Sequence, residues 1–185
     1  MEIDKRAPAT KLLWVDLEMT GLDPQRHRII EIAAEVTDFN FKSLASYEAV
    51  VLQSDEVLAD GNEWTKKQFA ENGLADKIRA EGRPETEVIN EFATFIRTAF
   101  GTEPAVLAGN SIHQDRAFIR QWWPGVDALL HYRMFDVSSW KILMQSKYGV
   151  PFEKAETHRA LGDIHESIAE LEFYLQWFKD HAANV

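Results

Sequence analysis

Cysteine is absent from all 185 residues of the sequence. This absence excludes a disulfide framework, a zinc site built on thiolates and a cysteine nucleophile. The sequence also lacks a run of about 20 apolar residues of the kind that crosses a membrane. The first ten residues mix charges and contain no apolar stretch, so they predict no signal peptide. These absences favour a soluble protein of the cytoplasm that has no membrane partner.

Basic residues are scarce beside acidic ones. The chain has 20 Lys and Arg against 30 Asp and Glu, which gives a formal net charge of −10. A protein that holds a long nucleic acid normally neutralises each contacted phosphate with Lys or Arg. We therefore expect no groove for a long nucleic acid. The balance still allows a short one, or one bridged to carboxylates by metal ions.

Length and composition indicate one globular domain. Hydrophobic residues make up 45% and charged residues 27% of the chain, which is ordinary for a globular protein and excludes intrinsic disorder. A chain of this length typically forms a single domain. We expect a flexible N-terminal arm over residues 1–10 and one domain over residues 11–185, with no internal repeat or linker.

The order of the expected elements predicts an α/β fold. Residues 12–19 are largely apolar at both alternating sets of positions, which predicts a central strand covered on both faces. Strands over 28–37 and 47–53 follow after short connections and predict an antiparallel meander. Strands followed by alternating helices and strands predict a mixed sheet with helices on both sides. The later elements are expected as helices over 63–80, 84–100, 114–123, 139–147 and 158–180, and as strands over 105–108 and 132–137.

Two acidic residues interrupt the first strand. Asp16 and Glu18 are two positions apart, so their side chains leave the same face of the strand. Like charges on a largely apolar strand repel one another and lose hydration. A bound divalent cation would relieve both problems. The alternative is that both side chains emerge past the strand end into solvent.

A third acidic residue lies on the inward face of a predicted helix. Asp115 precedes the apolar residues Phe118 and Ile119 by three and four positions, which places it on their face of the helix over 114–123. A charge on that face is costly unless it is paired or binds a metal. The alternative is that Asp115 acts as a cap or dipole partner at the helix N-terminus.

Asp163 and His158 lie near the start of the last helix. Taken alone, a helical Asp usually faces solvent, and a lone His near a helix start is usually structural or exposed. With Asp16, Glu18 and Asp115, however, they complete a set of four carboxylates and one imidazole. Oxygen ligands suit Mg²⁺ or Mn²⁺ rather than zinc. Four carboxylates are enough to hold two such ions for in-line attack on a phosphodiester.

Three segments resemble the three motifs of the DEDDh 3′–5′ exonuclease superfamily, and they stand in the family's order. They read Asp-Leu-Glu-Met-Thr-Gly at 16–21, Gly-Asn-Ser-Ile-His-Gln-Asp at 109–115 and His-Arg-Ala-Leu-Gly-Asp at 158–163. Within the superfamily the chain is similar to oligoribonucleases, through longer strings at 14–23, 131–138 and 166–171. The resemblance covers nearly the whole chain. It implies a ribonuclease H-like fold, in which a mixed five-stranded sheet is flanked by helices.

The resemblance also implies a mechanism. Asp16, Glu18, Asp115 and Asp163 would hold two divalent cations, Mg²⁺ or Mn²⁺. His158, in its neutral form, would take a proton from a metal-bound water as general base. The resulting hydroxide would attack the terminal phosphodiester and release a 5′-mononucleotide. The implied substrates are short oligoribonucleotides, from dinucleotides to chains of a few residues.

Substrate contacts and assembly follow from the same resemblance. Leu22 and Tyr132 would pack on bases, and Arg133 would grip a phosphate. The family forms homodimers in which the Tyr132 region completes the partner's site. The departures are Phe69, where the family often has His, Ser139, where Thr is common, and Gly162, where an acidic residue is frequent. The implied substrate-binding residues are Leu22, Trp64, Ser111, Tyr132, Arg133, Ser138 and Ser139.

Two other functions stay open at this stage. One is an exonuclease of the same superfamily that acts on longer single strands or on the 3′ ends of tRNA or DNA. The net charge of −10 argues against it. The other is a non-catalytic nucleotide-binding module on the same fold. The complete set of four carboxylates and His158 argues against that function. A structural alternative, in which the acidic residues only add solubility, also stays open, and Asp115 on an inward helix face argues against it.

Overall fold

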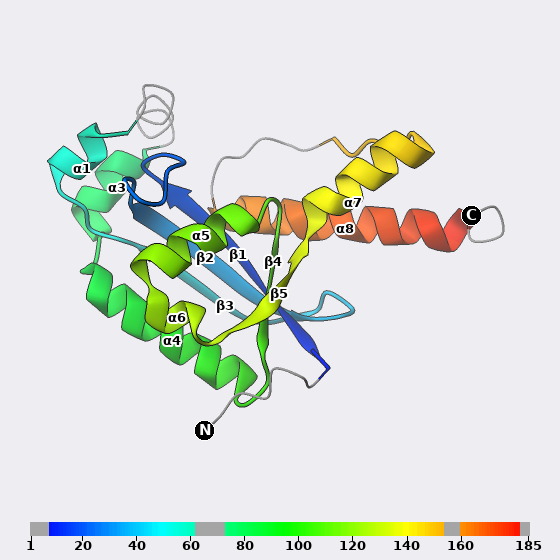
Figure 1. The fold of residues 1–185 in the computed structure, drawn as a ribbon, viewed down its shortest axis with the longest axis horizontal. Helices are drawn as coiled ribbons and strands as arrows, with labels where there is room; N and C mark the ends of the chain where they lie inside the picture. Colours follow the sequence, from blue (N-terminus) through cyan, green and yellow to red (C-terminus); the bar gives the residue numbers. More distant parts are fainter. Residues whose placement is uncertain (1–7, 62–72, 154–159, 182–185) are drawn as a thin grey trace.

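The computed structural model describes residues 8–61, 73–153 and 160–181. Its centre is a five-stranded sheet in the order β3-β2-β1-β4-β5 (Figure 1). The first three strands form the predicted antiparallel meander, and β4 and β5 run parallel to β1, so the predicted mixed five-stranded sheet is confirmed. The strands are β1 Lys11–Met19, β2 Ile29–Asp38, β3 Ser43–Val50, β4 Ala105–Gly109 and β5 Leu130–Asp136.

Helices cover both faces of the sheet, as predicted. The odd-numbered residues Leu13 and Val15 of β1 pack into a core with α4 and α5, whereas Leu12 and Trp14 pack on the other face against α8. None of the helices in the described ranges is long and apolar enough to cross a membrane. The helices are α1 Asp55–Ala59, α3 Leu74–Glu81, α4 Glu85–Phe100, α5 His113–Trp122, α6 Pro124–Asp127, α7 Val137–Leu143, the π-helical turn η1 Met144–Tyr148, and α8 Ala160–His181.

Some boundaries differ from the predicted ones. The third strand lies over Ser43–Val50 instead of 47–53, because β3 is an edge strand whose first half is mostly exposed and gives little apolar signal. The helix predicted over 139–147 is a helix followed by a π-helical turn. Part of the helix predicted over 63–80 lies outside the described residues, and α3 begins after Gly73, which has the left-handed φ of 72°.

The parallel strands bring distant parts of the chain to one edge of the sheet. The carboxyl ends of β1, β4 and β5 lie at the same edge because these strands run in the same direction. Helices α5 and α7 begin just beyond β4 and β5, and the first turn of α8 lies beside the end of β1 (Figure 1). In open α/β sheets, this edge is where ligands bind.

Candidate active site at the carboxyl edge of the sheet

Three carboxylates meet at this edge. Asp16 and Glu18 leave the face of β1 that α8 covers, and Asp163 lies in the first turn of α8. Each contributes an oxygen, and these three oxygens lie within 4.8 Å of one another. All three residues are half-buried. The structure therefore brings together three of the four carboxylates that the sequence singled out.

The local backbone of β1 opens space for this cluster. The pairing of β1 with β4 extends only from Leu12 to Trp14, and a register shift in the pairing with β2 falls between Glu18 and Met19. Irregularities of this kind are common beside active sites because they redirect side chains. Gly109 ends β4 close to β1, since a Cβ at this position would lie 3.0 Å from the carbonyl oxygen of Val15.

Asp115 lies beside the cluster but is held differently. It shares the buried face of α5 with Phe118 and Ile119, as predicted, and only 7% of it is exposed. Its Oδ1 accepts a hydrogen bond of 3.0 Å from the backbone N–H of Leu17. Burial raises the pKa of Asp115 to about 7, against a lowering effect of that hydrogen bond. Among the residues that the structure describes, the three-carboxylate cluster does not include Asp115.

One more acidic side chain lies on the sheet face that carries Asp16 and Glu18, and it was not predicted as part of the site. Glu31 of β2 stands directly opposite Glu18 in the strand register and is buried. Like charges opposite one another destabilise a sheet. Lys77 of α3 offsets this, since its Nζ lies 2.9 Å from Oε1 of Glu31. The available signal was an acidic residue within the apolar run Ile-Ile-Glu-Ile at 29–32.

Two serines form a polar patch at the ends of β4 and β5. The hydroxyl oxygens of Ser111 and Ser138 lie 3.2 Å apart. The backbone N–H of Ser111 donates to Oδ1 of Asp136 at 3.0 Å and to Oγ of Ser138 at 2.8 Å. These bonds hold Ser111 in the left-handed region, at a φ of 51°. Holding a non-glycine residue in that backbone conformation costs roughly 1–3 kcal/mol. Strained residues of this kind cluster at functional sites.

A network of part-buried and buried hydrogen bonds connects this patch to α8. Oγ of Ser138 donates to Oδ1 of Asn110 at 3.3 Å, and Nδ2 of Asn110 donates to Oε2 of Glu170 at 3.2 Å. The hydroxyl of Tyr174 donates to Oε1 of Glu170 at 2.8 Å. Burial, together with Glu170, raises the pKa of Tyr174. Glu170 lies in the string at 166–171 that resembles oligoribonucleases, but it was not predicted as a site residue, because a helical Glu is usually exposed and its partners lie far away in the chain.

The other predicted substrate contacts are exposed. Leu22 and Tyr132 are 72% and 60% exposed, and Arg133 and Ser139 are exposed as well. The guanidinium of Arg133 lies 5.1 Å from the centre of the Tyr132 ring. Tyr132 therefore lies on the surface of β5 and not in the core. The predicted residues His158 and Trp64, and the departure at Phe69, lie outside the described residues.

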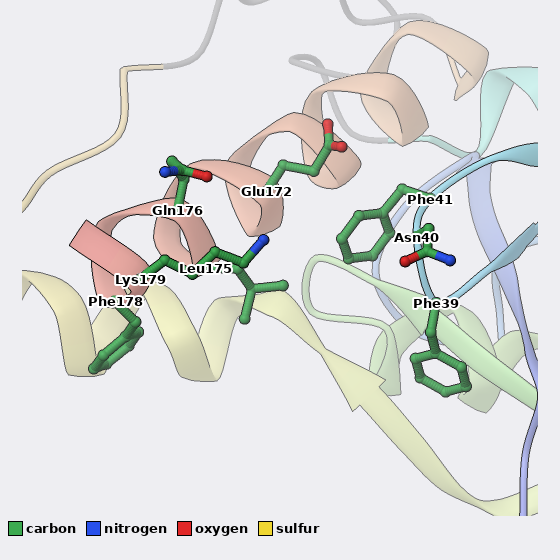
Figure 2. Close-up of a pocket in the computed structure, with 8 residues that line it drawn as sticks. All are labelled: Phe39, Asn40, Phe41, Glu172, Leu175, Gln176, Phe178 and Lys179. Atoms are coloured by element: carbon green, nitrogen blue, oxygen red, sulfur yellow. The ribbon is translucent and has the colours of Figure 1, made fainter. Parts of the chain in front are cut away.

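A separate groove of about 680 Å³ lies away from the carboxylates. Phe39, Asn40 and Phe41, at the hairpin between β2 and β3, line one side of it, and the C-terminal half of α8 lines the other; the Phe41 ring points towards α8 (Figure 2). Its charged lining residues are one acid and one base, Glu172 and Lys179. None of the three clustered carboxylates lines this groove. The groove is therefore not the candidate active site, which lies at the carboxyl edge of the sheet.

The match to a family model, and not the acidic cluster by itself, shows that the protein is of the exonuclease class. The model of the RNase_T family, described as exonuclease, matches residues 13–171. An oligoribonuclease of Francisella tularensis subsp. tularensis (strain WY96-3418) is 46% identical over 171 residues, which cover 91% of this chain and 96% of that protein. An oligoribonuclease of Shewanella loihica (strain ATCC BAA-1088 / PV-4) is 42% identical over 172 residues, 91% of this chain and 95% of that protein. The chain belongs to the oligoribonuclease family.

Solved structures confirm the ribonuclease H-like fold. E. coli exonuclease I, in a zinc-bound complex with single-stranded DNA, superposes with a TM-score of 0.69 at 16% identity, over 94% of this chain. Exonuclease I of Methylocaldum szegediense superposes with a TM-score of 0.66 at 19% identity, over 87% of this chain. The chain spans 43% and 39% of those longer proteins, so the likeness concerns the fold.

Proposed function

We propose that this protein is a 3′–5′ exoribonuclease that degrades short oligoribonucleotides, from dinucleotides to chains of a few residues, to 5′-mononucleotides. The observation that carries the proposal is the meeting of Asp16, Glu18 and Asp163 within 4.8 Å at the sheet edge. The hydroxyls of Ser111 and Ser138 lie at the same edge, at the ends of the neighbouring strands. The family membership of the chain supports the same activity.

The donor set fits divalent cations. The clustered ligand atoms are carboxylate oxygens, which suit Mg²⁺ or Mn²⁺. Asp16, Glu18 and Asp163 would hold two such ions, with Asp115 beside them as a fourth ligand. When bound, the ions would lower the pKa of a water and stabilise charge on the leaving 3′ oxygen. A metal would also favour the charged form of Asp115, whose burial in the metal-free protein raises its pKa to about 7.

The chain itself supplies the proton acceptor and the substrate contacts. His158, five residues before Asp163 in the sequence, acts as the general base that takes the proton of the attacking water. Arg133 and the hydroxyls of Ser111, Ser138 and Ser139 bind the phosphate at the 5′ end of the substrate. Leu22, Trp64 and Tyr132 pack against the bases. Stacking of a base on an aromatic ring contributes about 1–3 kcal/mol, so a short substrate needs few basic residues.

The exposed surface of β5 and α7 supports a homodimer. Tyr132 and Met134 lie exposed on β5, an edge strand of the sheet, and Ile142 and Leu143 lie exposed on α7. An exposed edge strand is a common site of association between chains. In the dimer, Tyr132 and Arg133 of one chain complete the active site of the other.

A 5′-phosphorylated diribonucleotide is expected to be hydrolysed to two mononucleotides, and much faster than a 20-residue RNA. The physical reason is the acidic surface, which offers a long strand little neutralisation of its phosphates. Chromatographic analysis of the products with Mg²⁺ or Mn²⁺ measures both rates. Equal rates on the two substrates would favour the alternative of an exonuclease for longer strands, and failure to cleave the diribonucleotide would contradict the proposal.

Tyr132→Ala is expected to raise the KM for the diribonucleotide by about 5- to 150-fold, the equivalent of about 1–3 kcal/mol of stacking. Tyr132→Phe keeps the ring and is expected to stay near wild type. Mixing Tyr132→Ala chains with Asp163→Asn chains should restore activity, because one site of each heterodimer then receives intact carboxylates and an intact partner tyrosine. Chains that carry both substitutions serve as the control and should restore nothing. A monomer that cleaves dinucleotides would contradict the shared site.

A further inference from the structure

An exposed leucine stands at the end of the acidic strand on an ordered turn. Leu22 is 72% exposed, although it lies only four residues after Glu18. Two hydrogen bonds close the base of the turn. The N–H of Thr20 donates to the carbonyl of Arg28 at 3.0 Å, and the N–H of Arg28 donates to Oγ1 of Thr20 at 3.1 Å. The turn therefore has a fixed origin on the sheet.

One imidazole holds the residues on both sides of Leu22. The ring of His27 packs so closely on Gly21 that a Cβ at this position would lie 2.5 Å from the ring. Nδ1 of the same ring accepts a hydrogen bond of 3.0 Å from the N–H of Asp23. Gly21 and Asp23 thus contact one face and one edge of the ring, which restricts the backbone that carries Leu22.

Helix α5 also holds the turn. Nε2 of Gln114 donates to the carbonyl oxygen of Leu22 at 2.6 Å. The next residue, Asp115, accepts a hydrogen bond from the N–H of Leu17 at 3.0 Å. Two consecutive side chains of one helical turn therefore fix the strand of the acidic cluster and the turn of Leu22 relative to each other.

We propose that Gln114 is a positioning residue that sets the place of Leu22 relative to the carboxylate cluster, so that the leucine side chain is ready to pack against a substrate base. This inference rests on the proposed function. Gln114 acts through Leu22 and does not itself contact the substrate. Without its hydrogen bond the carbonyl of Leu22 loses its anchor on α5, so the residue gains freedom that substrate binding must remove, and the entropic cost weakens binding. The expected effect therefore falls on KM.

A double-mutant cycle tests this role. We compare wild type, Gln114→Met, Leu22→Ala and the double variant on the 5′-phosphorylated diribonucleotide, and measure kcat, KM, the Mn²⁺ activation constant and the Tm of each. Gln114→Met is expected to raise KM about three- to tenfold, with little change in kcat or Mn²⁺ activation. In the Leu22→Ala background the same change should alter KM less than about twofold, because the residue it positions is gone.

Matched variants keep the test decisive. Gln25→Met replaces an exposed glutamine of the same turn and should leave KM unchanged. Gln114→Asn keeps the amide but shortens its reach. If Gln114→Met folds poorly, Gln114→Asn should show the same rise in KM and the same dependence of that rise on Leu22. If Gln114→Met raises KM by the same factor in the wild-type and the Leu22→Ala background, the positioning role is overturned, while the proposed function stands. A wild type that fails to cleave the diribonucleotide would overturn both.

Discussion

Asp163→Asn is expected to remove nearly all activity and to leave the fold intact. Asparagine keeps the shape of the side chain but removes one of the three charges that meet within 4.8 Å. Loss of a single electrostatic contact at a reacting centre commonly costs about 10²–10³-fold in rate, and loss of a metal ligand should cost at least as much. Asp16→Asn and Glu18→Gln should behave alike. Diribonucleotide hydrolysis and calorimetric titration with Mn²⁺ measure the two effects.

Two comparisons separate metal binding from other roles. Glu172→Gln removes an exposed charge from the same helix and should leave the rate and Mn²⁺ binding unchanged. His158→Ala should lower the rate by about 10²–10⁴-fold while Mn²⁺ still binds, because a general base is not a ligand. Wild-type turnover that persists in excess chelator would contradict the metal site.

Asp115→Asn is expected to abolish activity but to stabilise the metal-free protein at alkaline pH. Burial raises the pKa of Asp115 from 3.8 to about 7. Since the folded pKa lies above the unfolded one, the folded state binds the proton more tightly. The contribution of Asp115 protonation to the stability of the folded state is fully present below about pH 4, and it is lost as the pH rises towards and through about 7. The substituted asparagine side chain would carry no charge at any of these pH values and could still accept the hydrogen bond from Leu17.

Thermal unfolding in chelator at pH 5 and pH 8 measures this effect. The Tm difference between Asp115→Asn and wild type should grow from pH 5 to pH 8 by several degrees, since 1 kcal/mol moves the Tm of a protein of this size by about 2–4 °C. Asp163→Asn, at a half-buried position, should show a smaller change. Added Mn²⁺ should stabilise wild type more than Asp115→Asn, because an ion that binds only the folded state raises its stability. An Asp115→Asn protein less stable than wild type at pH 8 in chelator would contradict the argument.

Local patterns in the sequence were sufficient for the fold class and for most of the candidate site. The apolar residues of 12–19 predict a strand covered on both faces, because burial on both sides removes the alternation that a half-exposed strand shows. Asp16, Glu18 and Asp115 stood out because each is a charge on an otherwise apolar face. These signals depend on neighbours only a few residues away, so they can be read without the fold.

Only the tertiary structure decided which side chains meet. Asp163 reaches Asp16 and Glu18 because α8 covers that face of β1, and Gln114 reaches the carbonyl of Leu22 across 92 positions of sequence. Glu31 stands opposite Glu18 because of the strand register, and Asn110 is anchored on Glu170 of α8, 60 positions away. Such contacts depend on how three parallel strands end at one edge and on how the following helices pack there. Periodicity within a single segment carries no information about that packing.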